Sequence, residues 1–367
     1  MKSLKLALSA VLLTVSAQAL AQTPKAVVSA YSKFVFTRYT ETLTATKLMN
    51  EKIQAFTQAP SAESLEAAKT AWVEARKLYS TTEVFRFYSG PIDREDGPEG
   101  LINAWPLDEV YIDSVRGDNG AGFINDLVNY PTLSKELLIE LNEKDGEKNI
   151  STGWHAIEFM LWGQDFNING PGNRPYTDFT VKKNADRRRQ YLSLVSDLLI
   201  EHLTHLAEEW NPANGANYVA DFASPAKTLE SLGFILTGTV QLAGFELSQE
   251  RLFVAYDTQL QEDEHSCFSD TTHNDIVYNF LGIKEALTLN GGSVLELVKA
   301  KDAALATRLE IQLEVTEKAV RAIPAPFDQA IFSDDGRAAI LTAVTELENL
   351  GADLKTAATL LGVAILQ

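Results

Sequence analysis

Residues 28–43 of the chain read VSAYSKFVFTRYTETL. Within this stretch, apolar and aromatic side chains recur at steps of three and four residues, at Val28, Tyr31, Val35, Tyr39 and Leu43. Such spacing places them on one face of an amphipathic helix. The chain lacks the series of short alternating segments, separated by tight Asn-Gly or Asp-Gly turns, that a sheet protein would show. We therefore predict an all-α fold.

The same periodicity continues outward from this stretch toward the end of the chain. It recurs in residues 68–78, 191–202, 225–256, 276–287, 293–323 and 336–354. A polar segment that begins Asn211-Pro-Ala-Asn-Gly215 separates two sets of about four helices. We predict two helical-bundle domains, an N-terminal bundle over residues 22–210 and a C-terminal bundle over residues 211–367.

The balance of charges argues against two classes of partner. The 367 residues include 32 Lys and Arg against 50 Asp and Glu, which gives a formal net charge of −18. Proteins that bind nucleic acid or anionic membrane surfaces need clustered Lys and Arg. The content of 45% hydrophobic and 22% charged residues is that of a packed globular protein. We expect no nucleic-acid partner.

The first 21 residues have the layout of a secretory signal peptide. Lys2 and Lys5 precede a short apolar run, and Ala19-Leu-Ala21 stands before Gln22 as a cleavage site. We therefore predict a signal peptide over residues 1–21 and export to the periplasm. A lipid anchor would require a Cys at the cleavage point, where Gln22 stands.

A single Cys, Cys267, rules out an internal disulfide and a Cys-based cluster, so a metal site would have to use His and carboxylates. The densest candidate is the pair His155 and Glu158 in the segment Gly153-Trp-His-Ala-Ile-Glu158. Residues three apart share one helical face, so both side chains can reach one ion. The same spacing also occurs in surface pairs and in hydrogen bonds along a helix. Bulky apolar neighbours over residues 154–162 indicate a partly buried pair, and a buried carboxylate must be paired or coordinated.

The residue after Glu158 bears on a peptidase function. Phe159 occupies the position where an inverted HxxEH motif would have its second His, and the segment is not the HExxH of zincins either. A peptidase built on either of these motifs is therefore unsupported.

A second cluster, residues 261–275, reads QEDEHSCFSDTTHND and holds two His and five acidic residues. These residues look like ligands. The alternative, to which we give equal weight, is that Ser269 or Asp270 caps the following helix while the early acids suit its positive end. A nucleophilic role for Ser266 or Cys267 beside His265 is weaker, because adjacency in sequence says little about the geometry of a triad.

A third segment, residues 79–113, is rich in loops. It contains Glu83, Arg86, Asp93, Arg94 and Trp105, together with several Pro and Gly residues. Long loops in a compact domain are usually functional or disordered, and the content of Pro, Gly and aromatic residues predicts an ordered one. The alternative is a rigid crossover held by Arg–Asp pairs.

Taken together, the three segments resemble the imelysin-like family. Residues 153–158 match its GxHxxE motif, and residues 86–106 and 263–273 are similar to two further blocks of the family. Three blocks in this order are more specific than any one of them, and the resemblance covers essentially the whole mature chain. The sequence is most similar to the branch described as iron-regulated protein A.

The resemblance implies an exported bacterial protein of two helical bundles that is associated with iron acquisition. Its functional site would gather around the GxHxxE segment at the domain interface. The family name comes from a member reported to cleave insulin, and a related module occurs in the periplasmic component of a ferrous iron uptake system. The resemblance carries over Gly153, His155 and Glu158 from the motif, and Glu83 is similar in placement to an acidic residue of the iron-uptake module.

Our leading hypothesis is a periplasmic metal-binding protein that serves bacterial iron uptake. The predicted metal ligands are His155 and Glu158, with Glu83 as a third. The residues expected to shape the pocket are Gly153, Arg86, Asp93, Arg94, Trp105, Asp263, His265, Ser266 and Asp270. Carboxylate and imidazole donors suit Fe, Mn or Zn, and the resemblance favours iron as the divalent ion. We expect an iron carrier or membrane components of an iron-uptake system as partners.

Two other functions stay open. One is a metallopeptidase, in which the metal activates water and a carboxylate acts as general base. The other is a module that binds a non-metal ligand or is purely structural, in which His155 and Glu158 only hold the two bundles together.

Overall fold

The computed structural model describes residues 22–366 of the chain. The predicted signal peptide, residues 1–21, lies outside these described residues. Over residues 22–366 the secondary structure is helical, apart from one isolated β-bridge between Val115 and Asp118. This confirms the predicted all-α fold. In the same part of the chain, no helix is both long enough and apolar enough to cross a membrane.

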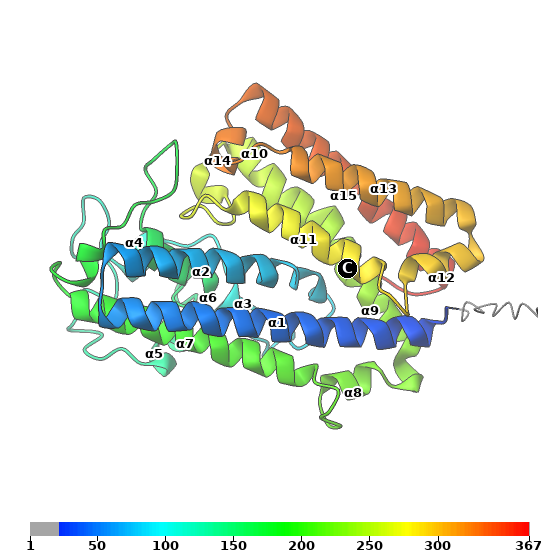
Figure 1. Ribbon diagram of the computed structural model, residues 1–367, viewed down its shortest axis with the longest axis horizontal. Coiled ribbons are helices and arrows are strands. Elements are labelled where there is room, and N and C mark those ends of the chain that lie inside the picture. Colours follow the sequence, from blue (N-terminus) through cyan, green and yellow to red (C-terminus); the bar gives the residue numbers. More distant parts are fainter. Residues whose placement is uncertain (1–21, 367) are drawn as a thin grey trace, which may run out of the picture.

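The N-terminal half is built on three long helices that lie side by side (Figure 1). Shorter helices fill the connections, and α6 carries the GxHxxE motif. The helices of this half are α1 (Pro24–Gln58), α2 (Ala62–Ser80), η1 (Glu83–Phe85), α3 (Glu99–Ile102), α4 (Glu109–Ile112), α5 (Lys135–Leu141), α6 (Gly153–Trp162), η2 (Tyr176–Phe179) and α7 (Ala185–Glu209).

The C-terminal half contains a long, continuous helical stretch whose middle part is wound as a π-helix, η4. Its helices are α8 (Tyr218–Phe222), η3 (Pro225–Lys227), α9 (Thr228–Gln241), η4 (Leu242–Phe253), α10 (Val254–Thr258), η5 (Gln261–Asp263), α11 (Thr272–Leu287), α12 (Val294–Lys301), α13 (Ala303–Ala322), α14 (Phe327–Ala330) and α15 (Asp334–Leu361).

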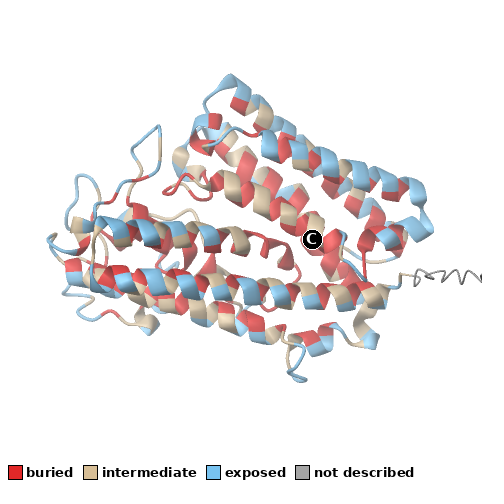
Figure 2. Cartoon of the chain, viewed as in Figure 1, coloured by how far each residue is buried: buried red, intermediate tan, exposed pale blue. Residues whose placement is uncertain are grey.

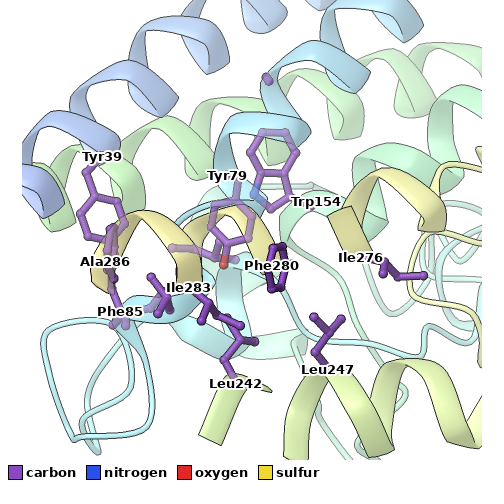
Figure 3. Close-up of a cluster of buried hydrophobic side chains, with 14 of the residues drawn as sticks. Tyr39, Tyr79, Phe85, Trp154, Leu242, Leu247, Ile276, Phe280, Ile283 and Ala286 are labelled. Atoms are coloured by element: carbon purple, nitrogen blue, oxygen red, sulfur yellow. The ribbon is translucent and has the colours of Figure 1, made fainter. Parts of the chain in front are cut away.

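Each half has its own packed interior, and the two halves share an apolar contact surface. In the N-terminal half α1 packs on α2 and α7, and in the C-terminal half α15 packs on α13, η4 and α9. Exposed side chains cover the outward faces of the helices, while buried ones gather where the helices face one another (Figure 2). Between the halves, Tyr79 and Trp154 lie close to Phe280 and Ile283 in the apolar cluster of Figure 3.

The segment just after residue 211 packs on the N-terminal half. Phe222 of α8 stacks on Tyr31 of α1, with ring centroids 5.9 Å apart, and its ring lies 5.0 Å from that of Trp210 at the end of α7. The division of the chain at residue 211 stays a prediction, and the short α8 belongs by its contacts to the preceding half.

One predicted helix is broken into two. The periodic pattern of residues 293–323 predicts one helix, whereas the structure has α12 and α13 with a break at Asp302. The Asp302 side chain accepts hydrogen bonds from the backbone N–H groups of Ala304 and Leu305, both at 3.0 Å. Because an Asp can satisfy the free N–H groups of a helix start, it begins a new helix without interrupting the apolar period.

Candidate functional site

The motif helix α6 is buried along its whole length. Its ten residues include six large apolar or aromatic side chains, and the helix packs on α2 and α7. Gly153 starts the helix with φ of +85°, and a Cβ at this position would lie 2.3 Å from the carbonyl oxygen of Ile102. Only glycine fits such a close backbone approach at positive φ. Gly153 therefore acts on the site by letting α6 begin at this point.

His155 and Glu158 contact each other directly. The Nδ1 atom of His155 lies 2.8 Å from Oε2 of Glu158. The other carboxyl oxygen, Oε1, accepts hydrogen bonds from the backbone N–H and the hydroxyl of Ser269, at 2.9 and 2.7 Å. Burial raises the pKa of Glu158 to about 8, although the Ser269 hydroxyl acts in the opposite direction. The carboxyl group thus uses both oxygens inside the protein.

Arg76 occupies the space that the motif His faces. Its Nη2 atom lies 3.3 Å from Nε2 of His155, and its Nε atom donates to Oδ1 of Asp275 at 3.0 Å. Its Nη1 atom donates to Oδ1 of Asn103 at 2.5 Å. Because a guanidinium group can only donate, Nε2 of His155 must accept, and the ring proton is on Nδ1 facing Glu158. Burial and the Arg76 charge hold the pKa of His155 well below its usual value, so the ring is neutral.

His265 stacks against the same guanidinium group. Nη2 of Arg76 lies 3.3 Å from Nδ1 and 3.2 Å from Nε2 of His265. An atom almost equidistant from both ring nitrogens lies over the ring face, since an in-plane approach would overlap ring carbons. Arginine commonly stacks on flat rings in this way. The ring of Trp105 packs edge-on against the ring of His265, with centroids 5.0 Å apart.

Asp275 supplies the negative charge that balances Arg76. It accepts hydrogen bonds from the hydroxyls of Ser80, at 2.7 Å, and Ser266. Burial alone would raise its pKa, but the charge of Arg76 and hydrogen bonds from His265 and Ser266 outweigh burial and hold the pKa well below the usual value. We call Arg76, Asn103, His155, His265 and Asp275 the Arg76 cluster. It joins α2 and α6 of one half to α11 and the preceding loop of the other.

Glu83 belongs to a separate network. Its Oε2 atom accepts hydrogen bonds from Arg251 of η4, at 2.5 Å, and from Arg86, at 2.9 Å. Arg86 also pairs with Glu99 at 3.1 Å, and Arg251 pairs with Glu246 at 2.8 Å. Burial raises the pKa of Glu83, but the two guanidinium groups lower it far more. Glu83 is thus ionised, and the hydrogen bonds of its Oε2 atom join it to two arginines, not to the motif residues.

Three of the predicted pocket residues lie away from the Arg76 cluster. Asp93 closes a local turn by accepting from the backbone N–H groups of Phe87 and Gly90. Arg94 pairs at 2.8 Å with Asp96, whose side chain is 80% exposed. Asp263 is half-buried in the short helix η5. Asp93 and Arg94 therefore serve the crossover loop, as the alternative for this segment expects.

The loop before α11 contributes side chains to the site, but the structure differs from the sequence interpretation in the helix cap and in the partner of Ser266. The helix begins at Thr272 with Thr271 as its N-cap residue, so neither Ser269 nor Asp270 is the cap. Ser269 is used by Glu158, and Asp270 adopts positive φ of 54° with its carboxyl group buried. Ser266 donates to Asp275, not to His265. Burial raises the pKa of the half-buried Cys267 thiol well above its usual value, so it is a poor nucleophile.

The residues present do not enclose a metal ion as they stand. Among residues 22–366, no group of three or more His, Cys, Asp and Glu side chains is arranged to hold one. The cation between the two imidazoles is the Arg76 guanidinium. Ligation by His155 and Glu158 would require Arg76 to leave and Glu158 to release hydrogen bonds. Their predicted role as metal ligands is untested, and these contacts favour the alternative in which the pair is structural.

Sequence reasoning missed Arg76, considered Ser269 only as a helix cap, and counted Asp275 only as one acid of a cluster. Arg76 lies between Ala75 and Tyr79 on the buried face of α2, and a charged residue inside an apolar stripe was the signal that could have revealed it. Asp275 lies 199 residues from Arg76, so no local pattern links them.

Three comparisons place the chain among known proteins. A family model described as Imelysin matches residues 35–354. Iron-regulated protein A of Synechococcus elongatus is 25% identical over 312 residues, which cover 82% of this chain and 75% of the relative.

Two solved structures have a similar fold. A protein from Parabacteroides distasonis, described as an iron-regulated protein A precursor, has a TM-score of 0.72 at 18% identity, with 94% of this chain and 97% of that chain covered. An imelysin-like protein from Psychrobacter arcticus has a TM-score of 0.68 at 15% identity, with 94% and 99% covered.

Proposed function

Because the chain belongs to the imelysin family, we propose that it is an exported iron-binding protein of bacterial iron uptake and not a peptidase. Support for the link to iron comes from its likeness to Iron-regulated protein A. Iron is the cargo in this proposal, and export to the periplasm follows the predicted signal peptide. Its expected partners are an iron carrier or membrane components of the uptake system.

The observation that carries the choice between binding protein and peptidase is the position of Arg76. A catalytic zinc held by the motif would need an open position for water, but the Arg76 guanidinium group fills the space that His155 faces, 3.3 Å from its Nε2 atom. The motif residues are also closed off, since His155 is 3% exposed and Glu158 is fully buried. A polypeptide substrate has no access to them in this conformation.

Metal content tests the proposal most directly. The full chain would be purified without affinity tags or chelators from iron-replete cells, and its iron measured by elemental analysis. Equilibrium dialysis against Fe(II) without oxygen would follow. We expect iron at a fixed ratio to protein. Absence of iron in both measurements would overturn the proposed function.

A second experiment separates a ligand role of His155 and Glu158 from a structural one. Melting curves would be recorded with and without Fe(II), Mn(II) and Zn(II) for the wild type, His155→Ala, Glu158→Ala and the double variant. We expect lower melting temperatures in the variants, because each leaves a buried partner unpaired, and an unchanged shift on adding metal. Loss of the shift in either single variant, with little further loss in the double variant, would instead make them ligands of one ion.

The peptidase alternative is tested by incubating an unfolded protein with the metal-loaded chain. We expect no cleavage above background. Cleavage that a chelator abolishes, and that Glu158→Ala also abolishes, would favour the metallopeptidase.

A further inference from the structure

Four carboxyl side chains lie near enough to influence one another beside the motif site, and we call them the carboxylate cluster: Asp165, Glu264, Asp270 and Asp328. They come from three segments, which are the loop after α6, the loop before α11, and α14. Hydrogen bonds tie these segments together. Gln261 donates to Asp165, the backbone N–H of Gly172 donates to the carbonyl of Phe268 at 3.0 Å, and Gln329 donates to the carbonyl of Ile168 at 3.4 Å.

The carboxylate cluster contains buried carboxyl oxygens that accept no hydrogen bond from any residue of the described range 22–366. Glu264 is 1% exposed, Asp328 2% and Asp270 6%. Both carboxyl oxygens of Glu264, both of Asp270 and one of Asp328 lack a hydrogen-bond partner. Buried polar atoms in native proteins are nearly always paired, and an isolated buried carboxylate is especially costly. Five such oxygens at one place indicate that something positive belongs there.

The neighbouring charges that raise the pKa values of these side chains are those of the other carboxyl groups in the cluster. Burial raises the pKa of Glu264 most, and Asp328 and Asp270 raise it further. Burial, Asp328 and Asp165 together raise the pKa of Asp270 to about 8. Carboxyl groups that lie this close to one another cannot easily all ionise unless a cation lies between them.

We propose that the carboxylate cluster is a binding site for a hard divalent cation, with Glu264 and Asp270 as central ligands. Oxygen-only donors select hard ions such as Ca²⁺, Mn²⁺ and Fe²⁺ over softer ions that prefer nitrogen or sulfur. If the ion is iron, the carboxylate cluster would be the iron site of the proposed function, and this part of the inference rests on that function. The cation site itself rests on the buried oxygens alone.

Binding requires the four side chains to turn toward a common centre. Among the described residues 22–366, no three acidic or histidine side chains enclose an ion as they stand. Like charges keep carboxyl groups apart, whereas an ion between them would draw them together. Asp270 adopts positive φ of 54°, a left-handed conformation that Asp tolerates better than most residues.

The cluster is also connected to the motif. Ser269, the residue before Asp270, donates two hydrogen bonds to Glu158. Asp165 follows the motif helix, while Glu264, Asp270 and Asp328 belong to the C-terminal half. A cation bound here would link the two halves and hold Ser269 against Glu158.

The test measures cation binding by the full chain after treatment with a chelator and its removal. Isothermal titration with Ca(II), Mn(II) and Zn(II), and with Fe(II) without oxygen, would be run on the wild type, Glu264→Gln and Asp328→Asn. The matched control is Glu262→Gln, which removes an exposed carboxylate two residues from Glu264. Both cluster variants keep the side-chain shape and remove an unpaired buried oxygen, so they should fold.

We expect one Ca(II) or Mn(II) per chain, weaker binding of Zn(II), and an affinity at least 10-fold lower in Glu264→Gln and Asp328→Asn. Glu262→Gln should stay within about twofold of the wild type, as expected for a surface charge. No binding of Ca(II), Mn(II) or Fe(II) by the wild type would overturn the site. Equal affinity in wild type and both cluster variants would also overturn it.

The outcomes separate this site from the proposed function. Binding of Ca(II) or Mn(II) that depends on Glu264, without any binding of iron, supports the site and removes the iron role. Binding of iron that is unchanged in Glu264→Gln supports the iron role and overturns the site for iron.

Discussion

Arg76 sets the chemistry of the motif site through its own charge. It is 2% exposed and contacts two imidazoles, one amide and one carboxylate. Its positive charge keeps His155 neutral and Asp275 ionised. The sequence suggests a site for a metal cation, but the guanidinium group of Arg76 already provides a positive charge there.

The first prediction concerns this guanidinium group. Arg76→Met would leave Asp275 buried without its partner, and we expect a loss of about 3–5 kcal/mol in the free energy of unfolding. Arg308→Met is the control, because Arg308 is 56% exposed in its pair with Asp353 and should contribute less than about 1 kcal/mol. Urea denaturation of both variants measures the difference. Equal stability of the two variants would mean that Arg76 is not the organising residue of the site.

The second prediction concerns the glycine of the motif. In Gly153→Ala the new Cβ would meet the carbonyl oxygen of Ile102 at 2.3 Å, at positive φ, so the start of α6 must shift. We expect a loss of about 2 kcal/mol or more. Gly117 also has positive φ, of 90°, but a Cβ there meets nothing within 4 Å, so Gly117→Ala should cost only about 1 kcal/mol. Similar losses in thermal unfolding for both variants would show that backbone strain alone, without the close contact, explains Gly153.

Helix packing in the C-terminal half depends on a close crossing of η4 and α15. A Cβ at Gly351 of α15 would lie 2.9 Å from the Cα of Gly244, whereas a Cβ at Gly244 of η4 would lie 3.5 Å from the Cα of Gly351. The first distance is a clash with backbone and the second is ordinary contact. The two helices therefore approach each other more closely on one side of the crossing than on the other.

This asymmetry gives the third prediction. Gly351→Ala should destabilise the protein by about 1–3 kcal/mol, because the helices must separate. Gly244→Ala should be neutral or stabilising by about 0.5–1 kcal/mol, because alanine replaces glycine inside a helix. Chemical denaturation of the two variants gives the comparison. The opposite order of stability would contradict the crossing described here.

Two buried ion pairs connect the halves of the molecule, in addition to the apolar cluster of Figure 3. Arg76 of α2 pairs with Asp275 of α11, and Glu83 of η1 pairs with Arg251 of η4. Buried ion pairs add little to stability compared with apolar contacts. However, any packing of the two halves that separates the charged partners leaves buried charges unpaired and is strongly disfavoured. They therefore fix how the two halves sit on each other.

The sequence predicts features that repeat or lie close together along the chain. Apolar periodicity located the long helices, and the three-residue spacing of His155 and Glu158 correctly placed their side chains in contact. The periodicity did not reveal the helix break at Asp302, because the apolar pattern continues across this residue. The sequence could not show that Glu83 pairs with Arg251, which lies 168 residues away.

Effects of pH on the whole molecule provide the fourth prediction. Asp270 and Glu158 have pKa values raised to about 8 by burial, and those of Glu264, Asp165 and Asp328 are raised as well. In the unfolded chain these groups titrate near pH 4. A raised folded-state pKa means that the folded protein holds the proton more tightly, so the stability is complete below about pH 4 and is lost as pH rises toward 8.

We therefore expect the free energy of unfolding, without added divalent cations, to fall between pH 6 and pH 8. Each such group contributes at most about 1.4 kcal/mol per pH unit. His155 and His265 act in the opposite direction, because their lowered pKa values cost stability only as pH falls below about 6.5. Glu264→Gln cannot ionise, so its stability relative to wild type should increase as pH rises, while Glu262→Gln should follow the wild type. Urea denaturation at pH 6, 7 and 8 measures this difference. If the difference in stability between wild type and Glu264→Gln does not change with pH, Glu264 does not hold a proton in the folded protein.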